Sequence, residues 1–153
     1  MPDEKKERDL AVNRRAYHDY FIDEKYEAGM MLTGTEVKSV RNGRTNLRDG
    51  FVRIVNGEAW LENVHISPYT EGNLMNHEPM RPRKLLLHRK EISSLIGKVK
   101  QKGYTLIPLR VYITRNHAKV EVGLARGKRQ YDKRASIAER EAKREIARAV
   151  RRG

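Results

Sequence analysis

The sequence predicts a mainly β fold, a small barrel with two or three short helices set between its strands. Apolar and polar side chains alternate in residues 51–55 and 58–66, and Asn56-Gly57 between them is the strongest short hairpin signal. Most connections between the expected strands are short, which favours a closed sheet. Among small barrels, the oligonucleotide-binding type suits a chain of 153 residues with a formal net charge of +13.

The N-terminal elements follow from capping and alternation. Residues 1–12 mix charges of both signs with little apolar content, so we expect a flexible arm. Asn13 is an expected N-cap for one helical turn through residue 19. Residues 20–32 alternate and carry aromatic and β-branched side chains, which predicts a first strand with a bulge or bend at Gly29.

A short basic helix is expected between two strands, in residues 34–41. Val37 and Val40 are three positions apart and share one helical face. Asn42-Gly43 ends the helix, because both residues tolerate a positive φ.

A long loop and a second helix follow the first hairpin. Residues 67–82 hold three prolines and are expected to form a loop, and residues 84–88 a short strand. Residues 90–102 carry Ile92, Leu95, Ile96 and Val99 at helical spacing, with Gly103 expected at the C′ position.

The last expected hairpin joins residues 104–115 to residues 118–125 around Asn116-His117. Pro108 lies within the first of these strands and predicts an edge or a bulge there. With this hairpin the chain has five or six expected strands. The predicted core includes Phe51, Ile54, Trp60 and Leu61, although the exposure of the tryptophan is ambiguous from alternation alone.

Composition changes after residue 125, so we expect a barrel at 13–125 and a basic tail at 126–153. The tail holds eleven Lys or Arg against four Asp or Glu. Ala138, Ala142, Ile146 and Val150 recur every fourth residue, but this mostly alanine face would bury little area. The tail is therefore predicted to be disordered alone and to fold along RNA, whose phosphates offset the repulsion between its cations.

The charge balance predicts a polyanionic partner. A sequence pI of about 10.2 and 35% charged residues favour nucleic acid or an anionic membrane as the partner. No apolar run approaches the ~20 residues of a membrane span, and the charged N-terminus is unlike a secretory signal. The absence of cysteine excludes disulfides and thiolate metal sites. A cytoplasmic, monomeric nucleic-acid-binding protein without membrane contact is expected.

Two other classes of function were compared with RNA recognition. A ribonuclease would need titratable side chains, which the five histidines, Glu36 and Asp49 offer. No spacing, however, fits a metal site or a phosphate loop. We therefore expect no catalytic residue, no metal and no cofactor. A generic RNA-binding protein explains the charge and the fold equally well.

Five blocks of sequence distinguish these alternatives. They are HDYFI at 18–22, EAG at 27–29, GTEVKS at 34–39, RKLLLH at 83–88 and GLARGKRQYDKR at 123–134. Together, in this order and spacing, they resemble the SmpB family, the small tmRNA-binding (SsrA-binding) proteins of bacterial trans-translation. The resemblance runs from about Asn13 to the C-terminus.

The resemblance implies a fold and a set of partners. The barrel would bind the tRNA-like domain of tmRNA and occupy the place of an anticodon stem in the ribosomal A site. The tail would probe the small-subunit decoding centre and the empty mRNA channel of a stalled ribosome, and so license alanyl-tmRNA. Elongation factor Tu would be reached indirectly, through alanyl-tmRNA.

The resemblance and the charge together indicate site residues. Glu27, Leu86 and His88, with His18 near them, match tmRNA-contact positions of the family. The basic residues Arg14, Arg15, Lys38, Arg41, Arg83 and Lys84 form either a solvated face or phosphate contacts, and the charge excess favours phosphate. The decoding-centre segment is matched by Lys128, Arg129, Tyr131, Asp132, Lys133 and Arg134.

Several of these residues have an alternative structural role. Tyr131, flanked by cations, either stacks on a base or anchors the tail. Glu27 either accepts a hydrogen bond from a base or orients an arginine. Leu86 is either core or an exposed contact for a nucleotide, and His18 favours an RNA contact or a local cap over an acid–base pair with its neighbour.

The sequence departs from the family pattern at two places. Many relatives have Asn where this chain has His88, so the hydrogen bonding there is expected to differ or to become pH-sensitive near ~6.5. Relatives often have Asn-Gly in the last hairpin, so Asn116-His117 predicts a looser turn.

Overall fold

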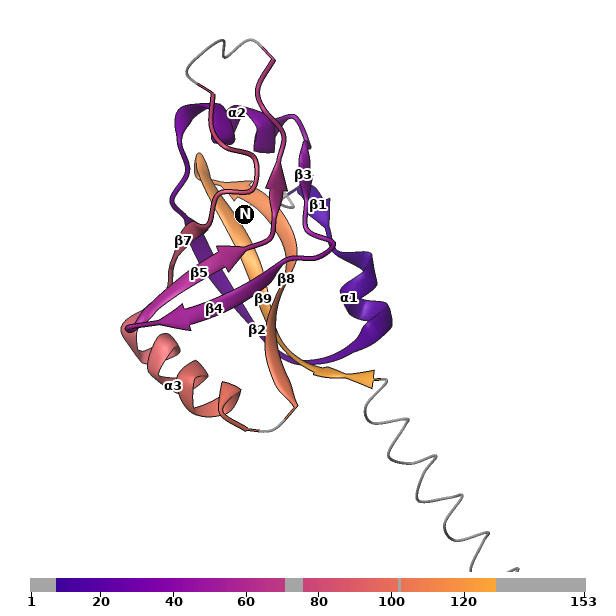
Figure 1. Cartoon of the computed structure of the whole chain (residues 1–153), viewed down its shortest axis with the longest axis vertical. Coiled ribbons are helices and arrows are strands. Elements are labelled where there is room, and N and C mark those ends of the chain that lie inside the picture. The colour runs from indigo at the N-terminus through magenta and orange to yellow at the C-terminus, as the bar shows by residue number, and fades with distance from the viewer. Residues whose placement is uncertain (1–7, 71–75, 102, 129–153) are drawn as a thin grey trace, which may run out of the picture.

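The centre of the fold is a pair of long antiparallel strands, β8 (Tyr104–Thr114) and β9 (His117–Gly127), joined by a tight turn (Figure 1). The computed structural model describes residues 8–70, 76–101 and 103–128. These form a seven-stranded antiparallel sheet in the order β1-β8-β9-β2-β7-β5-β4, and a two-stranded sheet of β3 and β6. The strands are β1 (Asp9–Val12), β2 (Tyr20–Met30), β3 (Thr45–Asn46), β4 (Phe51–Val55), β5 (Glu58–Glu62), β6 (His65–Ile66), β7 (Arg83–Leu86), β8 (Tyr104–Thr114) and β9 (His117–Gly127).

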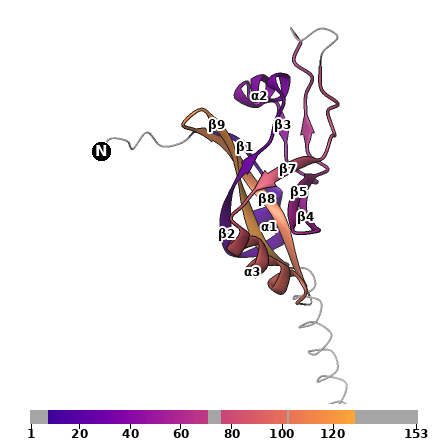
Figure 2. The ribbon, with the colours of Figure 1, turned by 90° about the vertical axis from the view of Figure 1, so that its left-hand side faces the viewer.

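The large sheet curls so that β4, at one end of the order, packs against β8. Three helices complete the fold: α1 (Arg14–Asp19), α2 (Gly34–Arg41) and α3 (Arg89–Val99). Figure 2 shows α2 and α3 at opposite ends of the barrel, with α1 between them. The predicted mainly β barrel with short helices is confirmed, although its chain is divided into more strands than the five or six expected.

Both predicted hairpins are present, but one of the turns is shifted. Asn56 and Gly57 have φ values of 51° and 75°, the left-handed pair of a two-residue hairpin turn. In the second hairpin Thr114 pairs with His117, so the turn residues are Arg115 and Asn116, with φ values of 51° and 66°. The expected turn at Asn116-His117 is therefore wrong by one residue. Because His117 is extended strand, the inference of a looser turn falls away.

One of the two predicted bulges is confirmed. The register of β8 against β9 shifts between Pro108 and Arg110, as expected for a proline without an N–H. Gly29, by contrast, pairs regularly with Leu86 on one side and Lys119 on the other. The irregularity of β2 lies between Ile22 and Glu24 instead.

The N-terminal arm is more ordered than predicted. Residues 9–12 form β1 and pair with β8, while residues 1–7 lie outside the described part of the chain. The predicted cap is confirmed: Asn13 Oδ1 accepts a hydrogen bond from the Ala16 backbone N–H at 3.2 Å. Its amide also donates to the carbonyl oxygens of Leu47 and Pro108, so one buried side chain joins α1 to two other segments.

The two longer helices begin at capping residues and end near the predicted positions. At α2, the Thr33 hydroxyl accepts from the Glu36 N–H and the Glu36 carboxylate accepts from the Thr33 N–H, which is a capping box. Helix α3 ends at Val99, earlier than expected, and Gly103 therefore is not its C′ residue. Gly103 has a φ of 92° in the connection to β8, where a residue with a Cβ would be strained.

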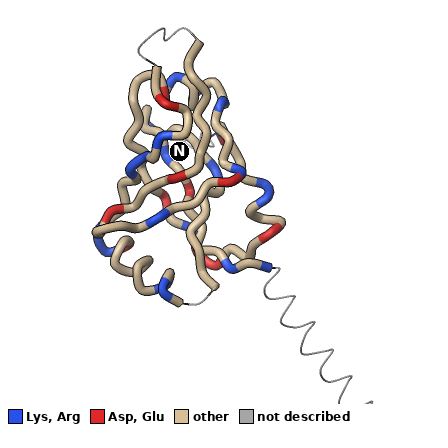
Figure 3. Tube along the Cα trace, viewed as in Figure 1, with Lys and Arg blue, Asp and Glu red and all other residues tan. Residues whose placement is uncertain are grey.

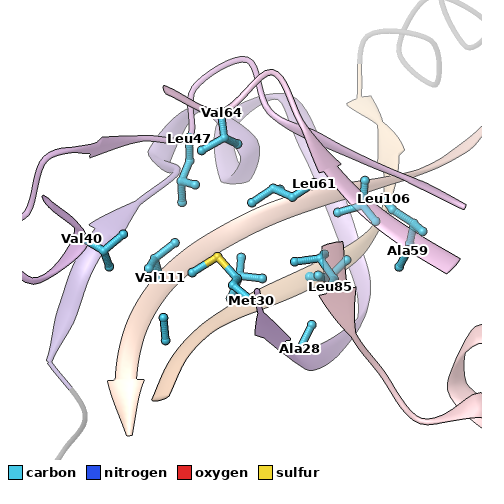
Figure 4. Close-up of a cluster of buried hydrophobic side chains, with 14 of the residues drawn as sticks. Ala28, Met30, Val40, Leu47, Ala59, Leu61, Val64, Leu85, Leu106 and Val111 are labelled. Atoms are coloured by element: carbon cyan, nitrogen blue, oxygen red, sulfur yellow. The ribbon is translucent and has the colours of Figure 1, made fainter. Parts of the chain in front are cut away.

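The core lies inside the barrel and draws on nearly every strand (Figure 4). Leu61 is buried in this core, and Ile54 packs against the core. Leu95 of α3 is also part of it, which places the helix over one end of the barrel. Trp60 is only half-buried. Phe51, predicted to be core, is 40% exposed because it is at the outward-facing start of β4.

Candidate RNA-binding surface

An exposed leucine lies on the outer face of the sheet. The register aligns Lys119 on β9, Gly29 on β2 and Leu86 on β7 in one row across three strands. Leu86 is 54% exposed, whereas its neighbour Leu85 is 2% exposed, because successive side chains of a strand point to opposite faces. A Cβ added to Gly29 would lie 3.5 Å from the Leu86 Cβ, so the leucine side chain covers the glycine. Leu86 is thus a surface residue.

Glu27 lies beside this row, and His88 follows it along the chain. Glu27 is two residues before Gly29 on β2 and therefore points to the same face, while His88 is two residues after Leu86, at the N-cap of α3. Both residues are exposed, and the Glu27 carboxylate is 3.9 Å from the Lys119 ammonium group. The structure therefore places two of the residues that sequence reasoning named, Glu27 and Leu86, on one sheet face, and adds Lys119, which no sequence signal indicated.

The end of α1 presents a second polar cluster. The Arg15 guanidinium donates to Asp19 at 3.2 Å and lies 3.6 Å from Asp49. His18 is exposed, and its Nδ1 is 2.9 Å from Asp19 Oδ1. Contact with His18 first, and with Arg15 second, lowers the pKa of Asp19 below its usual range. His18 and Asp19 therefore contact each other, although the sequence favoured an RNA contact or a local cap for His18 over a pair with its neighbour.

A groove of about 900 Å³ opens next to this cluster, between α1, the turn at Arg48 and the ends of β8 and β9. Its lining includes Arg15, His18, Arg48 and Tyr104. The volume falls within the roughly 300–1,000 Å³ of small-ligand sites, and the side chains offer cations for phosphate and rings for stacking. Arg48 was missed from the sequence because nothing in its neighbourhood marks a groove.

The other basic residues are spread over α1, α2 and the sheet face, and Figure 3 shows Lys and Arg along much of the chain. Arg14 is exposed on α1, and Arg41 is exposed on α2. The Lys38 ammonium lies 5.3 Å from the centre of the Tyr69 ring, which ties α2 to the loop after β6. Lys84 forms an ion pair with Glu58 at 2.6 Å on the sheet surface. Figure 3 shows acidic residues interspersed among these cations, so the surface of the barrel is mixed in sign.

Arg83 is a correction to the predicted phosphate contacts, because its side chain is fully buried. Its Nε donates to the buried Glu36 carboxylate at 2.7 Å, and its other nitrogens donate to the carbonyl oxygens of Val64 and Pro79. Arg81 donates to the same carboxylate at 2.6 Å. This ionic cluster joins α2, the segment between β5 and β6, and the residues before β7, so Arg83 is structural.

The pKa values in this cluster follow from burial and pairing. Burial by itself would raise the pKa of Glu36, but hydrogen bonds from Arg81, the Thr33 N–H and Arg83 hold it below its usual range. Burial lowers the pKa of Arg83, and Glu36 offsets part of that change. Both groups are charged at neutral pH, since arginine stays protonated in proteins. The Thr33-to-Glu36 spacing was a sequence signal for the cap, although not for the ion pair.

Of the predicted decoding-centre residues, the structure describes Lys128. Its ammonium group donates to the Tyr17 carbonyl oxygen at 3.2 Å. The remaining residues of that prediction, Arg129, Tyr131, Asp132, Lys133 and Arg134, lie outside the described residues.

Within residues 8–70, 76–101 and 103–128, no three His, Asp or Glu side chains converge as metal ligands would. Within the same ranges, no helix has the length and apolar character of a membrane span.

Comparison with known proteins gives a consistent set of relatives. The family model described as SmpB protein matches residues 10–152. An SsrA-binding protein of Bacillus cytotoxicus is 61% identical over 142 residues, covering 93% of this chain and 92% of the relative. An SsrA-binding protein of Roseiflexus castenholzii is 64% identical over 146 residues, covering 95% of this chain and 92% of the relative.

A solved structure described as "tmRNA-SmpB: a journey to the center of the bacterial ribosome" has the same fold. The two chains superpose with a TM-score of 0.66 at 55% sequence identity, over 77% of this chain and 83% of that chain.

Proposed function

The chain belongs to the SmpB protein family, and from this premise we propose that it binds tmRNA and acts in trans-translation. It delivers alanyl-tmRNA to stalled ribosomes that lack a codon in the A site. The relatives named SsrA-binding proteins and the ribosomal tmRNA-SmpB structure support this function over that of a generic RNA-binding protein.

The observation that carries the barrel's part is the exposed row of Leu86, Gly29 and Lys119. A leucine on an open sheet face offers an apolar contact to an unstacked nucleotide. Glu27 beside it and His88 at the N-cap of α3 offer a carboxylate acceptor and an imidazole for base edges, and Lys119 offers a cation for phosphate. We assign these residues to the tRNA-like domain of tmRNA.

Basic residues on α1, on α2 and on the sheet face hold the phosphate backbone. Arg14, Arg15 and His18 lie on α1, Lys38 and Arg41 lie on α2, and Lys84 lies on the sheet face near Leu86. Contacts of this kind set orientation and affinity without reading sequence. Arg83 is excluded from this set by its burial.

The tail supplies the second part of the function. Because β9 runs to Gly127 and Lys128 contacts α1, we place the boundary after Lys128 instead of after residue 125. The segment from Arg129 onward, with Tyr131, Asp132, Lys133 and Arg134, enters the decoding centre and the mRNA channel.

The protein acts as a monomeric binding factor in the cytoplasm, without catalysis of its own. It meets elongation factor Tu through alanyl-tmRNA. The relatives' names, which specify SsrA binding, support the role of a binding factor.

Binding is tested by competition at physiological salt, with labelled tRNA-like domain of tmRNA against excess bulk tRNA. We expect the complex to survive, since shape recognition adds to the non-specific phosphate attraction. Displacement by an equal concentration of bulk tRNA would favour the generic RNA-binding protein.

The division of roles is tested by truncation after Lys128. The shortened chain is expected to bind tmRNA within about twofold of the full chain, since β9 and its contacts are intact. It is expected to lose peptidyl transfer to alanyl-tmRNA on stalled ribosomes. Loss of tmRNA binding itself would contradict the division.

A further inference from the structure

We propose that Phe21 and Asp23 are positioning residues, which fix the direction in which the chain leaves the barrel after Lys128 and thereby aim the tail at its site. This inference rests on the proposed function of the tail. It concerns a cluster at the root of the tail, made of Tyr17, Phe21, Asp23, Tyr104, Arg126 and Lys128, which we call the root cluster.

Phe21 is the centre of the root cluster. It lies on β2 opposite Arg126 of β9, and its ring is 37% exposed. The Arg126 guanidinium is 5.4 Å from the ring centre, and the Lys128 ammonium is 5.2 Å from it. Two cations among the last described residues therefore lie at cation–π distance from one aromatic ring.

Asp23 holds the same arginine from a second direction. Its two carboxylate oxygens accept hydrogen bonds from Arg126, at 2.9 Å from Nε and 3.2 Å from a terminal nitrogen. The Tyr104 hydroxyl donates to the same carboxylate at 2.7 Å. Three strands, β2, β8 and β9, are thus joined where the sheet ends. The guanidinium, and then the tyrosine hydroxyl, lower the pKa of Asp23, so the acceptor is ionised at neutral pH.

Lys128 is also tied to α1. Its ammonium group donates to the Tyr17 carbonyl oxygen at 3.2 Å, while Lys25 lies 5.6 Å from the centre of the Tyr17 ring. The final residues of β9 and Lys128 therefore contact α1, the Phe21 ring on β2 and the Asp23 carboxylate. These contacts fix the backbone in the residues immediately before Arg129.

The alternative role for these rings is stacking on RNA bases. The geometry favours positioning, because the Phe21 ring already contacts two cations. Asp23 likewise already accepts hydrogen bonds from two nitrogens of Arg126. A base would have to displace these contacts to reach the ring. When the 25 residues after Lys128 start in a fixed direction, they sample fewer conformations that point away from their site. A larger fraction of the molecules is therefore competent for docking.

The test replaces Phe21 with Leu, which keeps an apolar side chain but removes the aromatic face. Loss of the two exposed cation–π contacts is expected to lower the fraction of molecules whose tail points at its site by roughly tenfold. The rate of peptidyl transfer to alanyl-tmRNA should fall by about tenfold, while affinity for tmRNA changes by less than about twofold. The variants F21Y and F21W, which keep a ring, should restore the rate.

Phe51→Leu is the matched control. Phe51 is the only other phenylalanine of the chain and is similarly exposed, at 40% against 37%, on β4. The control should change neither transfer nor tmRNA affinity. A loss of tmRNA affinity in F21L, absent in F51L, would overturn positioning in favour of direct RNA contact.

A coupling experiment separates aiming from general stability. Two glycines inserted between Lys128 and Arg129 leave the root cluster intact but uncouple the tail from it. The insertion should slow transfer to a similar degree as F21L, and the combination should be no slower than the insertion alone. Multiplied effects, or unchanged transfer in F21L, would overturn the proposal.

The closing control is the chain truncated after Lys128. If that chain transfers normally, the proposed function of the tail has failed and the inference falls with it. If truncation abolishes transfer and F21L does not slow it, the proposed function stands and only the positioning role is wrong.

Discussion

Replacing Glu36 with Gln is expected to lower the free energy of unfolding by about 3 to 4 kcal/mol, although the two side chains have nearly the same shape. Glu36 is fully buried and accepts hydrogen bonds from Arg83, Arg81 and the Thr33 N–H. The amide keeps one acceptor oxygen, but turns an NH₂ group toward the guanidinium groups. The Arg83 guanidinium, which has no exposed surface, then loses its counter-ion, and removal of one partner from a buried pair costs about 3–5 kcal/mol.

The matched control is Glu58→Gln. Glu58 and Lys84 form an ion pair at 2.6 Å, close to the 2.7 Å of Glu36 and Arg83, but their side chains are 44% and 36% exposed. Exposed pairs are worth about 0–1 kcal/mol, since water solvates the separated charges. We therefore expect E58Q to change the unfolding free energy by about 0.5 kcal/mol or less.

The assay is urea unfolding at pH 7 and moderate salt, followed by the fluorescence of Trp60, the single tryptophan. With a slope of about 1.5 kcal/mol per molar urea, E36Q should move the midpoint down by about 2 M. Circular dichroism of the sheet should report the same midpoint if unfolding is two-state. Equal shifts in E36Q and E58Q would refute the argument, because burial would then not decide the strength of the pair.

Three further outcomes are expected. Leu86→Ala should weaken tmRNA binding by about 1–2 kcal/mol, yet change stability by less than about 0.5 kcal/mol because the leucine is exposed; Val99→Ala, an exposed truncation on α3, should change neither, and a stability loss in L86A alone would mark it as core. Lys38→Ala and Arg41→Ala should each reduce the slope of log affinity against log salt by about 0.7–0.9, and an unchanged slope would remove that residue from the phosphate contacts. The folded pKa of Glu36 is depressed from its ordinary 4.5, so its stabilisation is present above pH 4.5 and is lost as pH falls through the lower folded pKa. The difference in unfolding free energy between the wild type and E36Q should therefore shrink below pH 4.5, and a difference that is constant from pH 7 to pH 3 would contradict the ionised assignment.

Features that depend on near neighbours in the chain could be predicted from the sequence. The turn at Asn56-Gly57 forms because both residues accept a positive φ. The cap at Asn13 forms because its side chain reaches the N–H three residues on. The helix at 34–41 was likewise predicted with its observed bounds. In each case the deciding contacts span a few residues, so local chemistry is sufficient.

The candidate site was named through the five blocks of sequence, and the structure changed its membership. Arg83 stands in a basic run, and no property of that run distinguishes it from Lys84; only the approach of Glu36 from α2 decides that one is buried and the other exposed. Leu85 and Leu86 are likewise equivalent in sequence. The pairing of β7 with β2 and β5 decides which of them faces the core.

The sequence by itself therefore determined the three helices, the two hairpins, the net charge and the family resemblance that indicates an RNA partner. The tertiary structure decided which charges are exposed and how far the last strand, β9, extends. Phe21 on β2 contacts Arg126 on β9, and these two strands are far apart in the chain. Glu36 on α2 accepts a hydrogen bond from Arg83 on β7, which is also distant in sequence. Such contacts depend on sheet register and burial, which are set by the packing of the whole barrel and not by the residues adjacent in sequence.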